Sequence, residues 1–231
     1  MQDIVFLLDV DNTLFDNDGL VDDLRRRLAD SFGNARAERY WTHFEALFSE
    51  LGYADYLGAL QRFRLRELGD DDISDPRLLQ MSDFLIDYPF ADRLYAGALG
   101  VVEHLQRFGV PVILSDGDAV FQPRKVQRSG LWQAVDGRVL IYVHKELMLD
   151  DVERRYPARH YVLVDDKPRI LSAMKSALGE RLTTVFPRQG HYALDPLAVD
   201  AFPPPDITLA RIADLRDVPL AALQGAARPT P

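Results

Sequence analysis

Four aspartates stand directly after short apolar runs of this 231-residue sequence, and their carboxylates are the groups most able to do chemistry. Asp9 and Asp11 follow the first run, and the adjacent pair Asp165 and Asp166 follows a later one. Carboxylates crowded into one cleft repel one another and raise one another's pKa unless a cation lies among them. Oxygen ligands suit Mg²⁺, a hard ion that shares its shell with water and a substrate phosphate. The aspartates therefore predict a Mg²⁺ site.

Two hydroxyl side chains, a turn sequence and a lysine also come soon after apolar runs, as the aspartates do. Thr13 comes soon after the first apolar run, Ser115 with Asp116 and Gly117 follows the second, and Lys145 follows the third. In an open parallel sheet, ligands bind beyond the carboxyl ends of the strands. If the runs are neighbouring parallel strands, all of these side chains converge on one cleft.

The apolar runs have the length and composition of strands. They are rich in Val, Ile and aromatic residues and do not alternate with polar residues, which is typical of parallel strands buried on both faces. Two further runs, 183–186 and 207–209, are weaker strand candidates. The four main runs are 4–8, 110–114, 139–143 and 161–164.

Helical patterns lie between these runs, and alternation of strands with helices predicts an α/β fold with a Rossmann-like parallel sheet. Gly109 and Gly179 follow two of the helical patterns and are expected to end them. The four predicted helices are 98–108, 122–129, 146–155 and 168–178.

The stretch between the first two runs is different, because it carries helical periodicity over nearly the whole of residues 16–92. Breaks are expected at Gly33-Asn34, at Gly52, at 69–75 and at Pro89. This is too long for one crossover, so we predict a helical domain at 16–92 inserted into a core of residues 1–15 and 93–231. Residues 203–205 are expected to form a rigid bend and residues 228–231 a loose tail.

Composition limits the function classes. The net charge is −9, without a basic run, which argues against a nucleic-acid partner or an anionic membrane surface. The absence of Cys excludes disulfides, thiolate nucleophiles and Cys-ligated zinc. No apolar run approaches the length of a membrane span and no signal peptide pattern is present, so the expectation is a cytoplasmic protein. The sequence leaves the oligomeric state open.

Taken together, the motifs resemble those of the haloacid dehalogenase superfamily. The stretch Asp9-Val10-Asp11-Asn12-Thr13 is similar to its first signature, DxDxT. Ser115 resembles the second signature, Lys145 the third and Asp165-Asp166 the fourth, all in the family's order. The resemblance implies a helical cap of the C1 type at the inserted stretch.

The same resemblance implies a role for each residue. Asp9 is expected to be the nucleophile that forms an aspartyl-phosphate, and Asp11 the general acid and base. Lys145 is expected to offset the charge of Asp9 and the phosphate. Thr13 and Ser115, with backbone N–H groups near Asp116 and Gly117, are expected to hold the phosphoryl oxygens. Mg²⁺ is expected to be ligated by Asp9, the Asp11 carbonyl and Asp166, with help from Asp165.

These roles favour a phosphohydrolase acting on a small phosphorylated metabolite. Relatives that displace halide from carbon lack an acid two residues after the nucleophile, so Asp11 argues against a 2-haloacid dehalogenase. A phosphomutase uses the same chemistry and stays open, as does a catalytically idle phosphate-binding protein. A phospho-aspartate receiver is disfavoured, because Lys145 precedes Asp165-Asp166.

Some neighbouring residues admit a simpler reading. Lys125 competes with Lys145 for the third role, and we favour Lys145 because it follows the third run and lies nearer the fourth motif. Arg169 is expected to be a surface residue at a helix start, and His191 a packed loop histidine, although His191 and Tyr192 could instead line the cleft. The aromatic residues between 40 and 63 are expected to form the core of the insertion, although some of them could stack on a substrate.

Overall fold

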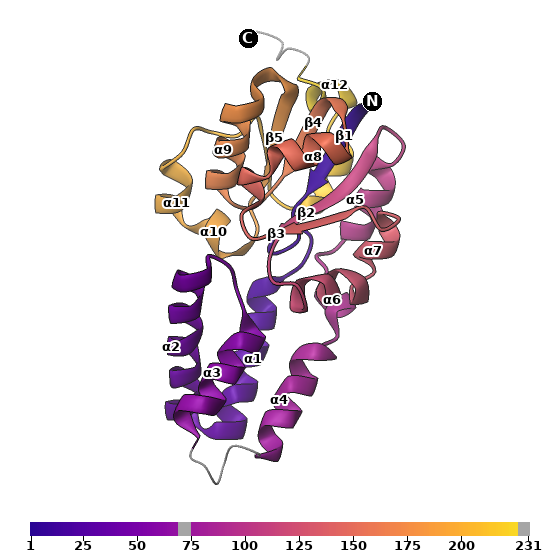
Figure 1. The fold of residues 1–231 in the computed structure, drawn as a ribbon. Coiled ribbons are helices and arrows are strands. Elements are labelled where there is room, and N and C mark those ends of the chain that lie inside the picture. Colours follow the sequence, from indigo (N-terminus) through magenta and orange to yellow (C-terminus); the bar gives the residue numbers. More distant parts are fainter. Residues whose placement is uncertain (69–74, 226–231) are drawn as a thin grey trace.

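A single parallel sheet organises the protein in the computed structural model, which describes residues 1–68 and 75–225 (Figure 1). The strand order is β3-β2-β1-β4-β5-β6, so β1 lies at the centre and the chain reverses its direction of travel there. Every pair of neighbouring strands is parallel. All six expected strands are present: β1 (Gln2–Leu8), β2 (Val110–Asp116), β3 (Val139–Tyr142), β4 (Ala158–Val164), β5 (Leu182–Pro187) and β6 (Ile207–Leu209).

Helices cover both faces of the sheet, as the non-alternating strands predict. Ile4, Phe6 and Leu8 of β1 pack on one side with α5 (Ala98–Leu105), α6 (Phe121–Arg128) and α7 (Leu131–Ala134). Val5 and Leu7 of the same strand pack on the other side with α8 (Leu149–Arg155) and α9 (Pro168–Leu178). The result is the expected three-layer α/β architecture.

Two helix boundaries differ from the sequence predictions. The helix predicted for 98–108 ends at Leu105, so Gly109 is not its capping residue. Gly109 instead faces β1, where an added Cβ would lie 2.5 Å from the Ile4 carbonyl oxygen, and only glycine permits that approach. The helix predicted for 146–155 is split into a 3₁₀ turn, η3 (Lys145–Leu147), and α8.

In its described residues, the insertion between β1 and β2 contains four α-helices, drawn in indigo to magenta in Figure 1. Aspartate side chains cap three of them: Asp16 accepts from Gly19 N–H, Asp55 from Gly58 N–H and Asp75 from Arg77 N–H. The first two helices end at Gly33 and Gly52, as expected, and both glycines have positive φ. The four helices are α1 (Asn17–Phe32), α2 (Asn34–Leu51), α3 (Tyr56–Glu67) and α4 (Pro76–Ile86).

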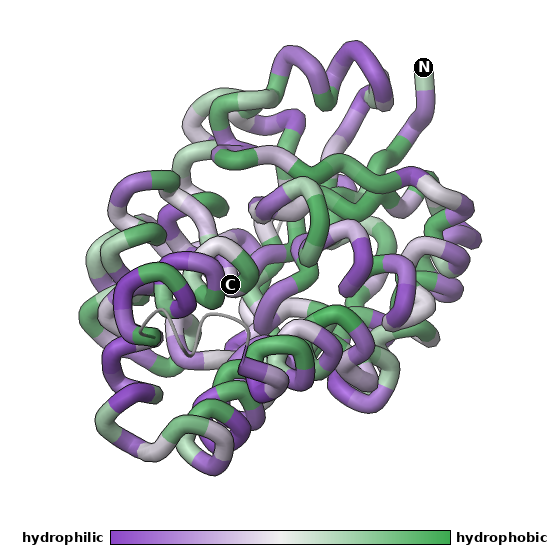
Figure 2. Tube along the Cα trace, turned by 60° about the horizontal axis from the view of Figure 1, so that its bottom comes forward, coloured by the Kyte–Doolittle hydropathy of each residue, from purple (hydrophilic) through white to green (hydrophobic). Residues whose placement is uncertain are grey.

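The helices of the insertion share one apolar core that is continuous with one face of the sheet. Figure 2 shows hydrophilic and hydrophobic segments alternating along them, as amphipathic helices require. The predicted aromatic core is present in Tyr40 and Phe63, which are fully buried. The chain returns to the core through Pro89 and η2 (Phe90–Arg93). The break predicted at 69–75 lies mostly outside the described residues.

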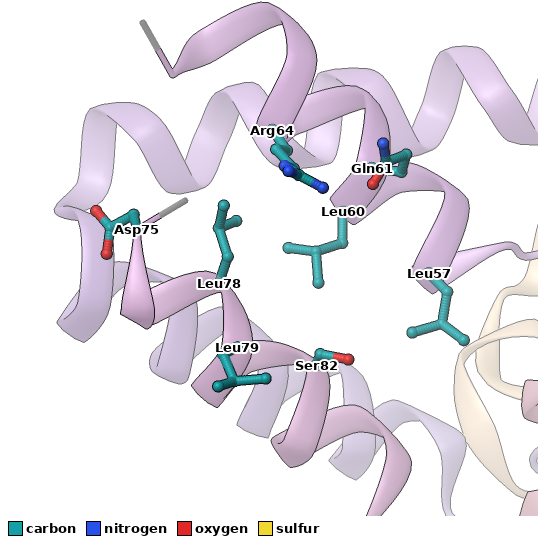
Figure 3. A pocket seen from close by; sticks show the side chains of 8 residues that line it. All are labelled: Leu57, Leu60, Gln61, Arg64, Asp75, Leu78, Leu79 and Ser82. Atoms are coloured by element: carbon teal, nitrogen blue, oxygen red, sulfur yellow. The ribbon is translucent and has the colours of Figure 1, made fainter. Parts of the chain in front are cut away.

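A small cavity of about 360 Å³ lies between α3 and α4, far along the insertion from the sheet (Figure 3). Leu60 and Leu78 extend from the two helices into the space between them. Leucines make up half of the described residues that line this cavity.

The C-terminal part completes the core. After β5 the chain forms two short helices, α10 (Gly190–Leu194) and α11 (Pro196–Asp200), before β6. Residues 203–205 connect them to β6 without regular structure. A 3₁₀ turn, η4 (Gly179–Arg181), precedes β5, and η5 (Ile212–Asp217) and α12 (Leu220–Leu223) follow β6. The predicted tail at 228–231 lies outside the described residues. None of the described helices is long and apolar enough to span a membrane.

Candidate active site

The residues that follow β1, β2, β3 and β4 meet at the carboxyl edge of the sheet. Leu8, the last residue of β1, is paired with Val164, the last residue of β4, and with Ile113 of β2, a strand that continues to Asp116. This register places Asp9 and Asp165 side by side just beyond β1 and β4, and Ser115 near the end of the neighbouring β2. The convergence predicted from the sequence is therefore present in the structure.

Lys145 lies at the centre of the cluster and is fully buried. Its Nζ lies 2.5 Å from Asp9 Oδ1 and 2.7 Å from Asp165 Oδ2. Burial alone lowers the pKa of a lysine, but the two carboxylates outweigh burial and raise the pKa of Lys145 above its usual value. Lys145 therefore stays charged and holds Asp9 in a fixed orientation.

Three carboxylate oxygens beside this lysine have no hydrogen-bond partner among the described residues. They are Asp9 Oδ2 and both carboxylate oxygens of Asp166, and all are buried. Asp9, Asp165 and Asp166 can each place an oxygen within 4.8 Å of the others. Unpaired buried carboxylate oxygens at this spacing fit a divalent cation, because hard cations take oxygen ligands.

The pKa values of Asp165 and Asp166 are consistent with a cation site. Burial, followed by repulsion from Asp9 and Asp165, raises the pKa of Asp166 well above its usual value. Burial also raises the pKa of Asp165 to about 6, although Lys145 opposes the shift. Asp165 is the better-partnered of the two, since its Oδ1 accepts the Lys167 N–H at 2.9 Å. Asp166 is therefore the more available ligand, and its buried charge needs a cation.

The side chains of Thr13, Ser115 and Asp116, residues expected to bind phosphate, accept hydrogen bonds from other residues of the site. Thr13 Oγ1 accepts the Asp166 N–H at 3.0 Å, which ties the first motif to the fourth. Ser115 Oγ accepts from the side-chain amide of Gln122 at 2.9 Å. Asp116 Oδ1 accepts the Lys145 N–H at 2.7 Å and so fixes the 3₁₀ turn that carries the lysine. Burial raises the pKa of Asp116.

Gly117 differs from its expected role. Its N–H donates to the Tyr142 carbonyl oxygen at 2.9 Å, which extends the pairing of β2 with β3. This amide is engaged in the sheet and is not free to hold a phosphoryl oxygen in this conformation.

Lys125 does not compete with Lys145 but belongs to a second ion pair. Its Nζ lies 2.5 Å from Asp11 Oδ1 and 3.0 Å from the side-chain oxygen of Asn17. The ammonium also lies over the rings of Phe15 and Phe121, at 5.1 and 5.5 Å from their centroids. The Lys125 side chain is only 1% exposed, so this buried ion pair fixes the position of the Asp11 carboxylate. The sequence analysis missed this pairing, and the only signal for it was a basic residue in the helix after Ser115.

Replacing Lys125 with Met tests this positioning. If Asp11 is the general acid that the sequence leads us to expect, Lys125→Met should lower kcat about tenfold or more on alkyl phosphates, because Asp11 would be misplaced. The loss is expected to be much smaller on p-nitrophenyl phosphate, whose leaving group needs no proton. Arg128→Met, an exposed change on the same helix, is the control; equal losses on both esters would contradict the positioning role.

A cavity of about 910 Å³ opens from the site between the insertion and the core. Asp11, Asp116 and Lys167 line its catalytic end. The insertion contributes residues of α1, α2 and the α2–α3 loop, and the core contributes residues of α10 and α11. The cavity is therefore large enough for a small organic substrate.

Two histidines of the core contact the insertion across this cavity. His191 Nδ1 lies 2.7 Å from Asp18 Oδ1 of α1, and the His191 N–H donates to Asp18 Oδ2 at 2.8 Å. The prediction of a packed loop histidine is therefore wrong, because α10 presents His191 to the insertion. His144 lies against Gly52, where an added Cβ would come within 2.6 Å of its ring. Arg169, expected on the surface, also lines the cavity, and its guanidinium pairs with Glu146 at 2.5 Å.

The comparison with protein families agrees with this geometry. The family model of haloacid dehalogenase-like hydrolases matches residues 5–186, which include every residue of the cluster described above. The chain belongs to this family. A search of curated proteins gave no significant match.

Solved structures extend the relationship. A haloacid dehalogenase-like hydrolase from Burkholderia xenovorans LB400 is 62% identical, with a TM-score of 0.87, and the match covers 95% of this chain and 100% of that one. L-2-haloacid dehalogenase from Xanthobacter autotrophicus shares the fold at 18% identity, with a TM-score of 0.58 and coverage of 94% and 97%. A hydrolase of this family from Bacillus subtilis, solved with bound magnesium, is 16% identical, with a TM-score of 0.61 and coverage of 94% and 98%. The haloacid dehalogenase-like hydrolase described here is thus an enzyme of the hydrolase class acting on a small molecule.

Proposed function

We propose that this hydrolase is a Mg²⁺-dependent phosphatase that cleaves a small phosphate monoester through an aspartyl-phosphate on Asp9. One observation carries the proposal: Asp9 has one oxygen held by Lys145 and the other unpaired next to Asp166. Asp11 stands two residues further on, at the mouth of the same cavity. A nucleophile, a cation site and an acid thus share one cleft.

The proposed reaction has two displacements at phosphorus. An oxygen of Asp9 attacks the phosphorus, the bond to the ester oxygen breaks, and Asp11 donates its proton to the departing alkoxide. Water then attacks the phosphorus of the aspartyl-phosphate, Asp11 takes a proton from that water, and the bond to Asp9 breaks. Lys145 and Thr13 remain in place in both steps, as charge and hydroxyl partners of the phosphoryl group.

The cation site fits Mg²⁺, with Asp9, the Asp11 carbonyl and Asp166 as its ligands and Asp165 as a supporting carboxylate. When bound, Mg²⁺ would neutralise charge that develops on the phosphoryl oxygens. The inserted helices, residues 16–92, are proposed to act as a cap over a core of residues 1–15 and 93–231. The contacts of Asp18 with His191 support closure of such a cap over the cavity.

The direct test is a screen of phosphorylated metabolites with Mg²⁺, with inorganic phosphate as the readout. We expect phosphate release that stops when EDTA removes the metal. Transfer of the phosphoryl group back to a hexose phosphate, without free phosphate, would indicate a mutase. Halide release from a 2-haloacid at a higher rate than phosphate release would overturn the proposal.

Metal binding can be measured without turnover, through the melting temperature. Mg²⁺ binds the ionised carboxylates, while burial raises the pKa of Asp165 to about 6 and that of Asp166 well above its usual value. Below these pKa values protons compete with the metal, so the rise in Tm caused by Mg²⁺ should be larger at about pH 8 than at about pH 5.5. Asp166→Asn should abolish most of the rise, and a rise of equal size in that variant would remove Asp166 from the ligand set.

A further inference from the structure

The wall of the large cavity formed by the insertion is aromatic. Trp41, Phe44 and Phe48 lie on successive turns of α2, and all three line the cavity. The ring centroid of Phe44 lies 5.4 Å from that of Trp41 and 6.5 Å from that of Phe48. Phe44 also stacks on Tyr56 at 5.0 Å with an interplanar angle of 15°. A row of rings therefore runs along this wall.

Part of this aromatic surface is exposed, although the core of the insertion does not need it. Phe48 is 42% exposed, at the end of α2 next to the cavity. On the core side of the cavity, Tyr192 of α10 is 37% exposed and lines the cavity together with Phe202. Aromatic rings left open in a concave site are the usual recognition surface for a flat apolar group.

The charges on the part of the cavity wall that the insertion forms argue against a second anionic group on the ligand there, whereas the basic lining residues Lys167 and Arg169 belong to the core, where Arg169 is paired with Glu146. Away from the catalytic aspartates, the insertion contributes Asp18, Asp22 and Glu45 to the lining. Arg25 is the one basic lining residue among the described residues of the insertion, and it is already engaged. Its guanidinium lies 4.6 Å from the ring centroid of Trp41 and 3.4 Å from Glu38.

We propose that the substrate is a phosphate monoester whose alcohol carries an aromatic ring and no further anionic group. The phosphate would lie at the Asp9 end of the cavity and the ring against the aromatic row of α2. This inference rests on the proposed phosphatase function, and it names the substrate class of the same site.

A series of esters with alkyl alcohols separates ring recognition from leaving-group chemistry. Ethyl, 2-cyclohexylethyl and 2-phenylethyl phosphate all release an alkyl alcohol, so differences in kcat/KM report on binding of the remote group. We expect 2-phenylethyl phosphate to exceed ethyl phosphate by about tenfold or more and to exceed the cyclohexyl ester as well. Equal values for the phenyl and cyclohexyl esters, or for the phenyl and ethyl esters, would overturn aromatic recognition.

Variants of the exposed rings locate the effect. Phe48→Ala and Tyr192→Ala should each reduce the preference for the phenyl ester over ethyl phosphate, mainly by raising the KM of the phenyl ester. Phe108→Ala is the matched control, because Phe108 is 38% exposed and does not line the cavity. A preference that survives in both cavity variants would contradict the proposed location.

Binding to Asp9→Asn by calorimetry tests the inference apart from turnover. The phenyl ester should bind about tenfold more tightly than ethyl phosphate, and a carboxylate on the ring, as in 2-(4-carboxyphenyl)ethyl phosphate, should weaken binding. Tight, ring-dependent binding without phosphate release from any ester in the wild-type protein would contradict the phosphatase proposal and support the ligand class. Phosphate release without ring-dependent binding would support the phosphatase proposal and contradict aromatic recognition.

Discussion

Asp9→Asn is expected to reduce phosphate release by about 10³-fold or more, while the fold and the affinity for substrate are retained. An amide cannot form the phosphorylated intermediate, and the side chain keeps its size and its place beside Lys145. Steady-state phosphate release, together with circular dichroism and a melting curve, checks both parts of the expectation.

Asp3→Asn is the matched control for this variant. Asp3 lies on β1, the strand that ends just before Asp9, has a side chain that is 81% exposed, and makes a long contact to Arg159 at 3.7 Å. Its activity should equal that of the wild-type enzyme. Substantial turnover by Asp9→Asn, in a preparation shown by mass spectrometry to be free of deamidated protein, would remove the nucleophile assignment.

Much of the fold and of the catalytic cluster could be predicted from the sequence, because buried parallel strands produce a recognisable pattern of continuous apolar residues. Runs such as 161–164 are apolar throughout since both faces are buried, and the residue after each run must lie at the carboxyl edge of the sheet. That logic located Asp9, Lys145, Asp165 and Asp166, which the structure brings together.

The surroundings of those residues could not be predicted, because they depend on contacts between elements that are distant in the chain. The pairing of Lys125 with Asp11 joins residues 114 positions apart, and helical periodicity shows only that one face of α6 is buried. The contact of His191 with Asp18 spans 173 positions and depends on how the insertion lies against α10. The bond from Gly117 N–H to Tyr142 was not foreseen because the pairing of β2 with β3 continues through Asp116, two residues beyond the apolar run 110–114.

Lys145→Met is expected to lower the stability of the protein by a large amount. Lys145→Met removes the ammonium that lies between Asp9 and Asp165 and leaves three buried carboxylates without that counter-ion. Breaking a buried ion pair from one side costs about 3–5 kcal/mol, because the remaining charge stays desolvated. For a chain of this size that corresponds to a fall in Tm of about 6–20 °C.

The pH dependence and the metal dependence of this loss distinguish a charge effect from a packing effect. The pKa values of Asp165 and Asp166 are already raised by burial and would rise further without Lys145, so these groups take up protons as the pH falls toward about 5.5. The gap in Tm between Lys145→Met and wild type should therefore be widest near pH 8 and should narrow at lower pH or when Mg²⁺ is added at high pH. Lys175→Met, which removes a partly exposed partner of Asp206, should show a small gap that neither pH nor Mg²⁺ changes in this way. A gap for Lys145→Met that is equally insensitive would show that the methylene chain, and not the ammonium charge among the aspartates, is what the site needs for its stability.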